Sequence, residues 1–138
     1  MSGSPQTPRH PLSILLVEDS FDAATSLALL LELYGHDVTV VSHAEAAIQK
    51  CNTDRFDVII LDINLNGIMN GWQLAAYIRA QEHPLRRKIL VAVTGYGTDD
   101  DKTNSYESGM DYHLTKPVEP ALFQKLLNEI SEKLVKRK

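Results

Sequence analysis

The sequence predicts an α/β fold in which a parallel sheet is covered by helices on both faces. Short apolar runs rich in Val, Ile and Leu stop abruptly at polar residues, as strands buried on both faces do. Segments with apolar residues at helical spacing lie between these runs. The two patterns alternate five times along 138 residues, which is the order of a doubly wound, single-domain protein.

The composition indicates a globular domain with a small excess of negative charge. Hydrophobic residues make up 43% of the chain and charged residues 23%, and the formal net charge is −4. This charge argues against direct contact with nucleic acid. The single cysteine, Cys51, rules out a disulfide framework and fits a cytoplasmic location. No apolar run approaches the roughly 20 residues that cross a bilayer, so we expect no membrane partner.

The first half of the chain is expected to form three strands and two helices. Residues 1–12 are expected to be a disordered lead-in to a domain over residues 13–138. Ser20 is predicted to cap the first helix and Gly35 to end it. Ser42 and Glu45 have the spacing of a capping box for the second helix. The expected elements are Ser13–Val17, Phe21–Tyr34, Asp37–Val41, a helix from the Ser42 cap to about Cys51, and Val58 to Asp62.

The second half is expected to continue the alternation. The expected elements are Trp72–Ala80, Lys88–Thr94, Asp99–Ser108, Tyr112–Thr115 and a last helix from Pro120 through Leu134. The helix that begins at Asp99 has little apolar content, but three acids in its first turn suit the helix dipole. The histidines outside the strands are expected to be solvated, namely His10, His36, His43 and His83.

Polar side chains follow four of the five predicted strands. Glu18 and Asp19 follow the first strand, Asp62 ends the third, Thr94 ends the fourth and Lys116 follows the fifth. Because the carboxyl ends of parallel strands share one edge of the sheet, we expect these residues to meet in one cleft. Three close carboxylates repel one another, and Mg²⁺ resolves the repulsion because it prefers oxygen ligands. Aspartate is also a nucleophile toward phosphorus, so the cleft suits phosphoryl chemistry.

These residues carry a resemblance to the receiver domains of two-component response regulators. The motifs are the acidic pair Glu18-Asp19, Asp62, Thr94 with the small Gly95 after it, and Lys116-Pro117, and the resemblance covers about residues 13–134. It implies a flavodoxin-like fold with five strands in the order 2-1-3-4-5 and five helices. It also implies a phosphoprotein that assists its own phosphorylation and dephosphorylation but is not an enzyme acting on other molecules.

The resemblance assigns the phosphoacceptor and the metal ligands. Asp62 would accept a phosphoryl group from a phosphohistidine on a histidine kinase or a histidine phosphotransfer protein. Asp19 and Asp62 would bind Mg²⁺ directly, Glu18 would act mostly through water, and Asn64 would contribute its backbone carbonyl.

The resemblance also assigns the switch and the output. Lys116 would contact the phosphoryl group, and Thr94 would move to hydrogen-bond it. His113 stands at the position of an aromatic switch residue. The fourth helix, fifth strand and fifth helix would form the face that meets a downstream protein target, and homodimer formation is a further alternative.

The sequence departs from the family pattern at two places. His113 replaces the usual Tyr or Phe, as is common in receivers of hybrid kinases, and this points to a phosphorelay. Asn66 stands four residues after Asp62, where the pattern usually has proline, and the loop before Gly71 is one residue longer. Both loop changes bear on its rigidity.

Two other functions remain open on the sequence. A receiver-shaped interaction module that is not switched by phosphate is the first alternative, because of the unusual loop and His113. A phosphatase of the haloacid-dehalogenase type is the second. It would need a second Asp two residues after the nucleophile, where this chain has Asn64.

Overall fold

The computed structural model describes residues 10–82, 87–95 and 97–136. Within these residues five strands alternate with five helices. In order they are β1 (Ser13–Val17), α1 (Phe21–Leu33), β2 (Asp37–Val41), α2 (Ala44–Thr53), β3 (Val58–Leu61), α3 (Gly71–Gln81), β4 (Ile89–Thr94), α4 (Asp99–Glu107), β5 (Tyr112–Thr115) and α5 (Pro120–Lys136). Every predicted element is present. Strands β1, β2 and β5 have the predicted bounds, and the bounds of the other elements differ by at most two residues.

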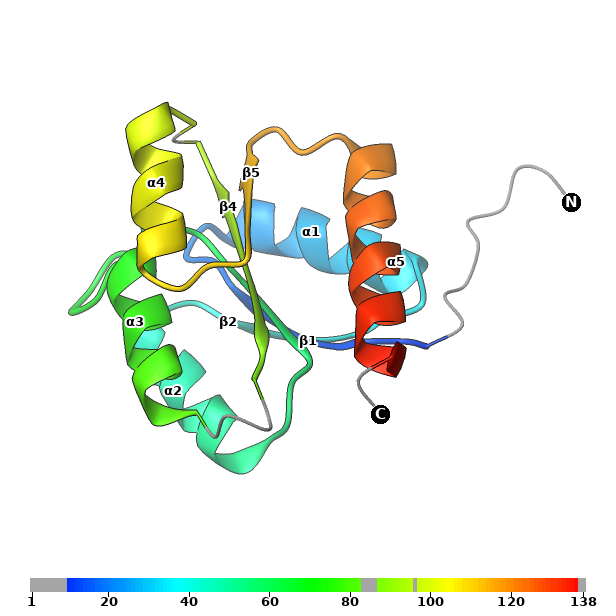
Figure 1. Cartoon of the computed structure of the whole chain (residues 1–138), viewed down its shortest axis with the longest axis horizontal. Helices are drawn as coiled ribbons and strands as arrows, with labels where there is room; N and C mark the ends of the chain where they lie inside the picture. Colours follow the sequence, from blue (N-terminus) through cyan, green and yellow to red (C-terminus); the bar gives the residue numbers. More distant parts are fainter. Residues whose placement is uncertain (1–9, 83–86, 96, 137–138) are drawn as a thin grey trace, which may run out of the picture.

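The strands form one parallel sheet in the order β2-β1-β3-β4-β5, as predicted. Helices α1 and α5 cover one face, and α2, α3 and α4 cover the other (Figure 1). Alternate side chains of each inner strand therefore enter two separate cores. In β1, Leu15 and Val17 pack toward α2 and α3, whereas Ile14 and Leu16 pack toward α1 and α5. This double burial explains why the inner strands are continuous apolar runs.

Side chains and glycines set the helix ends much as the sequence predicts. The Ser20 side chain accepts a hydrogen bond from the Ala23 N–H and so caps α1. Gly35 follows that helix with a φ of 94°, and Gly109 follows α4 with a φ of 108°. Such left-handed conformations favour glycine. The polar helix α4 is held at its start by a capping box between Thr98 and Asp101.

The prediction for the start of α2 is wrong in its capping residue. The N-cap is His43, whose Nδ1 accepts a hydrogen bond from the Ala46 N–H at 3.2 Å. The helix begins one residue later than the Ser42–Glu45 spacing implies, so Ser42 lies outside it. The predicted capping box does not form, because the imidazole of the next residue, His43, accepts the hydrogen bond that caps the helix.

The prediction that His36 is solvated is also wrong. His36 is 6% exposed, and its Nδ1 accepts a hydrogen bond from the Leu12 N–H at 3.0 Å. Residues 1–9 of the predicted lead-in lie outside the described residues. His83, which was also expected to be solvated, lies outside them as well. Leu12 is buried in the core beside α1 and α5, and the Ser131 hydroxyl donates to the His10 carbonyl at 2.6 Å.

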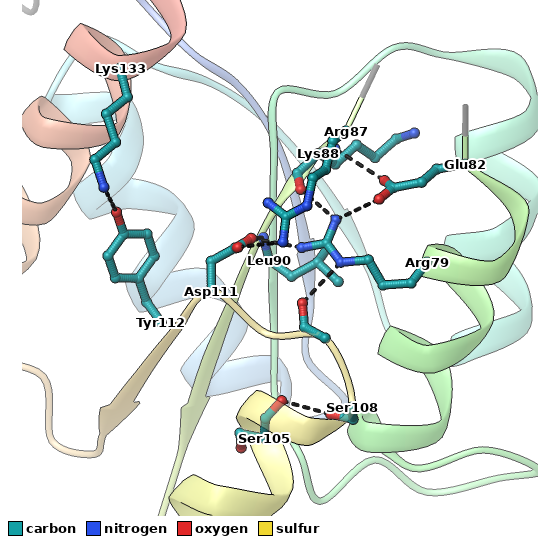
Figure 2. Close-up of polar contacts among 11 residues, drawn as sticks. Arg79, Glu82, Arg87, Lys88, Leu90, Ser105, Ser108, Asp111, Tyr112 and Lys133 are labelled. Carbon is teal, nitrogen blue, oxygen red and sulfur yellow. Dashed lines mark hydrogen bonds and ion pairs between the residues drawn. The ribbon is translucent and has the colours of Figure 1, made fainter. Parts of the chain in front are cut away.

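A group of ionic contacts centred on Arg79 ties α3 to the amino ends of β4 and β5 (Figure 2). The Arg79 guanidinium donates to the Gly109 carbonyl, to the Lys88 carbonyl, to Glu82 and to Asp111, all at 2.7–2.9 Å. Asp111 also accepts from the Leu90 N–H at 2.9 Å. These contacts, called the Arg79 cluster below, lie at the sheet edge opposite the predicted cleft. None of the helices in the described residues is both long and apolar enough to cross a membrane.

Candidate functional site

The carboxyl edge of the sheet brings together the predicted acidic and basic residues. Glu18 directly follows β1, Asp62 directly follows β3 and Lys116 directly follows β5. Each is fixed by a backbone hydrogen bond to a neighbouring strand. The N–H of Glu18 donates to Val41, that of Asp62 to Val17 and that of Lys116 to Thr94, at 2.8–3.1 Å. The side chains are thus held by the sheet rather than by a loose loop.

Three carboxylates meet at this edge. Oxygen atoms of Glu18, Asp19 and Asp62 lie within 4.8 Å of one another. Glu18 is 3% exposed and Asp62 is 9% exposed, while Asp19 is partly exposed. Charges this close and this shielded from water repel strongly unless a cation lies among them.

Lys116 supplies one such cation. Its Nζ lies 2.5 Å from Glu18 Oε1 and 3.1 Å from Asp62 Oδ2. Burial opposes the charge of Lys116, but hydrogen bonds to Glu18 and Asp62 outweigh it and raise the pKa of the ammonium above its ordinary value. Burial also raises the pKa of Glu18, despite the hydrogen bonds from Lys116 and the Ser20 N–H. One ammonium thus only partly offsets three carboxylates.

Backbone N–H groups hold each carboxylate as well. The Asn64 N–H donates to Asp62 Oδ1 at 2.9 Å, and the Ser20 N–H donates to Glu18 Oε2 at 3.2 Å. The Asn66 N–H donates to Asp19 Oδ2 at 3.1 Å. Sequence reasoning missed these donors because any residue other than proline has an N–H, so no side-chain pattern marks them.

Thr94 and His113 lie on the β4–β5 side of this edge. Thr94 ends β4 and is 1% exposed, and Leu61 pairs with Ala92, so Asp62 lies at the level of Val93, one residue before Thr94. His113 of β5 pairs with Ala92 of β4. The structure thus puts Thr94 at the acidic edge but His113 two residues further down the neighbouring strand.

His113 belongs to a chain of polar contacts that the sequence did not reveal. Its Nδ1 lies 2.8 Å from the Ser105 hydroxyl in α4, and the Trp72 Nε1–H in α3 donates to the same hydroxyl at 2.9 Å. Ser105 is completely buried. We call these three residues the Trp72–Ser105–His113 chain. Nothing in the polar sequence of α4 distinguishes Ser105 from its neighbours.

The three carboxylates fit a hard divalent cation. All three offer oxygen, the ligand that Mg²⁺ prefers, and the partial exposure of Asp19 leaves room for the waters that Mg²⁺ retains. The Lys116 ammonium beside them would attract an oxyanion. The site can therefore hold a metal ion next to a group such as phosphate, with the Asp62 carboxylate in contact with both.

The family model for the response regulator receiver domain matches residues 14–128. The sensor protein GacS of Pseudomonas syringae pv. syringae is 33% identical over 118 residues, which are 84% of this chain and 13% of that protein. The alkaline phosphatase synthesis transcriptional regulatory protein PhoP of Bacillus subtilis is 35% identical over 107 residues. These residues are 78% of this chain and 43% of that protein. The chain thus spans less than half the length of these relatives.

Solved structures of a receiver domain and of a response regulator are also similar to this chain. The receiver domain of a sensor histidine kinase from Pseudomonas aeruginosa PAO1 has a TM-score of 0.79 and 31% identity, covering 88% of this chain and 98% of that one. That structure holds a magnesium ion in its active site cleft. A chemotaxis response regulator of Vibrio cholerae has a TM-score of 0.78 and 25% identity, covering 87% of this chain and 98% of that one.

Proposed function

Because this chain belongs to the response regulator receiver family, we propose that Asp62 accepts a phosphoryl group from a phosphohistidine of a partner protein. The observation that carries this proposal is the Lys116 ammonium, which contacts Asp62 and Glu18 within a group of three carboxylates. Receivers of this family are phosphoaccepting in general, and the same family motif residues stand here at the carboxyl edge of the sheet.

The proposed reaction assigns a task to each residue. An Asp62 oxygen forms a bond to phosphorus while the bond from phosphorus to the histidine nitrogen breaks, and the electron pair stays on the nitrogen. The Asn64 N–H, which donates to Asp62 Oδ1, holds the carboxylate in place. Lys116 and the Thr94 hydroxyl donate to the phosphoryl oxygens, where negative charge is spread during transfer.

We propose Mg²⁺ as the cation of this site. Asp19 and Asp62 would bind it directly, Glu18 mostly through water, and Asn64 through its backbone carbonyl. When bound, the ion neutralises carboxylate and phosphoryl charge. A related receiver with magnesium in its cleft supports this assignment, as does the close approach of the three carboxylates.

Protein partners follow from the same proposal. A histidine kinase or a histidine phosphotransfer protein would supply the phosphoryl group, and the resemblance of the chain to a sensor protein supports this class of donor. The surface of α4, β5 and α5 would meet a downstream protein. His113 would act as the switch residue of that surface, because it joins β5 to α4 through Ser105.

Labelling with a small acyl phosphate tests the proposal. We expect the wild-type protein to gain the mass of one phosphoryl group in the presence of Mg²⁺. Asp62→Asn should gain none, whereas Asp54→Asn, which changes an exposed carboxylate at the end of α2, should label like the wild type. Labelling of Asp62→Asn to the wild-type extent would refute the assignment. Removal of Mg²⁺ by a chelator should abolish labelling of the wild type.

A further inference from the structure

The loop between β3 and α3 is held in a fixed conformation by a buried side chain, a tight turn and a backbone hydrogen bond. Leu65 is 6% exposed and anchors the loop in the core, and Gly67 turns the chain with a φ of 111°. The Gly71 N–H donates to the Ile63 carbonyl at 2.8 Å and closes the loop. A Cβ at Gly71 would lie 2.4 Å from the Asp62 carbonyl oxygen, so the closure is as tight as glycine permits.

The residue between the anchor and the turn is Asn66. Its N–H donates to Asp19 Oδ2 at 3.1 Å, across 47 positions of sequence. The N–H of Asn64, two residues earlier, donates to Asp62 Oδ1. One loop thus presents alternate N–H groups to two of the three clustered carboxylates, with the buried Leu65 between them.

We propose that the Asn66 N–H positions the Asp19 carboxylate for the metal ion, an inference that rests on the proposed function. A carboxylate that accepts a fixed hydrogen bond is confined to one orientation, so it loses less side-chain freedom when it binds a cation. Asn66 is therefore a positioning residue, and it acts through Asp19.

The contact uses the backbone, so the side chain of Asn66 has no part in it. Only proline would remove the N–H. Proline is the residue that the family pattern favours at this position, so the contact is a property of this chain that its family resemblance does not predict.

A pair of variants separates the N–H from the side chain. Asn66→Pro removes both, and Asn66→Ala removes the side chain alone. We would titrate each ¹⁵N-labelled protein with Mg²⁺, without phosphoryl donor, and obtain the Kd from amide shifts at Asp62, Thr94 and Lys116. We expect Asn66→Pro to weaken Mg²⁺ binding about tenfold, at the low end for loss of a group that supports a metal ligand. Asn66→Ala should bind like the wild type.

The outcomes distinguish this inference from the proposed function. If the wild type binds no Mg²⁺, the proposed metal site itself fails. If the wild type binds and Asn66→Pro binds equally well, the positioning role is refuted while the proposed function stands. Equal weakening in Asn66→Pro and Asn66→Ala would assign the effect to the side chain and overturn the inference.

A second measurement does not depend on the fold of Asn66→Pro. In the wild type without metal, the Asn66 amide hydrogen should exchange with solvent more slowly than in Asp19→Ala, by about tenfold for loss of one charge-assisted hydrogen bond of about 1.4 kcal/mol. The Asn64 amide, which donates to Asp62, serves as the internal control and should keep its rate. An unchanged Asn66 rate in Asp19→Ala would contradict the proposed contact.

Discussion

At the scale of single residues, His36 links the start of β1 to the end of α1. Its Nδ1 accepts the Leu12 N–H, so the ring must present an unprotonated nitrogen there. Burial lowers the pKa of His36 below its ordinary value of 6.5. A group with a lowered pKa in the folded state is protonated more readily in the unfolded state, so its contribution to stability is present above pH 6.5 and is lost as the pH falls.

This linkage gives a test by chemical denaturation. Between pH 7.5 and pH 5.5 the free energy of unfolding should fall by up to about 1.4 kcal/mol because of His36 alone. His36→Asn keeps an acceptor for the Leu12 N–H but has no titratable group, so it should lack this component. The quantity to compare is the difference between wild type and variant at each pH, since other groups titrate in both. A constant difference across the range would contradict the prediction.

At the scale of secondary-structure elements, the Arg79 cluster fixes α3 against β4 and the turn before β5. Arg79 and Glu82 are largely buried, and Asp111 accepts hydrogen bonds from Arg79 and Leu90 as well as an ion pair from Arg87 (Figure 2). Arg79→Met would leave two shielded carboxylates without their main partner. We expect it to lower the free energy of unfolding by about 3 kcal/mol.

The matched control for Arg79 is Lys50→Met. Lys50 Nζ lies 4.0 Å from Asp54 Oδ2 in an exposed pair at the carboxyl end of α2. Because exposed pairs contribute little, this variant should stay within about 0.5 kcal/mol of the wild type. Equal effects of the two substitutions, measured by denaturant unfolding, would mean that the Arg79 cluster contributes no more than a surface pair.

The Trp72–Ser105–His113 chain connects α3, α4 and β5 through polar contacts. Ser105→Ala would remove the acceptor of the Trp72 indole N–H and the hydroxyl that lies beside His113 Nδ1. We expect the indole N–H resonance of the single tryptophan to move upfield, and the indole hydrogen to exchange faster with solvent. Thr103→Ala, an exposed change on the same helix, should leave that resonance in place. An unmoved resonance in Ser105→Ala would contradict the contact.

The elements also show what the sequence can predict. Strands β1, β3 and β4 were predictable because burial on both faces demands uninterrupted apolar residues. The acids that follow β1 and β3 were predictable as neighbours because parallel strands share an edge. The His43 cap, the buried His36 and the Asn66 N–H were not. Each depends on which atom comes close after folding, and that is decided by tertiary contacts rather than by spacing along the chain.

At the scale of the whole molecule, the clustered carboxylates connect stability to metal binding. The sheet forces Glu18, Asp19 and Asp62 together, and Lys116 compensates only part of their charge. The fold is therefore under electrostatic repulsion where the proposed function requires negative charge. A cation that binds the folded chain and not the unfolded one must relieve this repulsion and raise stability.

Loss of the Asp62 charge should have opposite effects on stability without and with Mg²⁺. Without divalent ions, Asp62→Asn should raise the free energy of unfolding by about 1 kcal/mol, because two carboxylates then face one ammonium. With Mg²⁺ at ten times its Kd, the wild type should gain about 1.4 kcal/mol by mass action. Asp62→Asn should gain much less, because it has lost a proposed ligand.

Potassium chloride at the same ionic strength separates binding from screening. General screening acts on the wild type with either salt, so only the excess effect of Mg²⁺ reports a bound ion. If both salts stabilise the wild type equally, the cluster does not bind Mg²⁺ and its repulsion is a property of the fold alone. If Mg²⁺ stabilises the wild type far more than Asp62→Asn, the Asp62 carboxylate contributes to Mg²⁺ binding, as the proposed function requires.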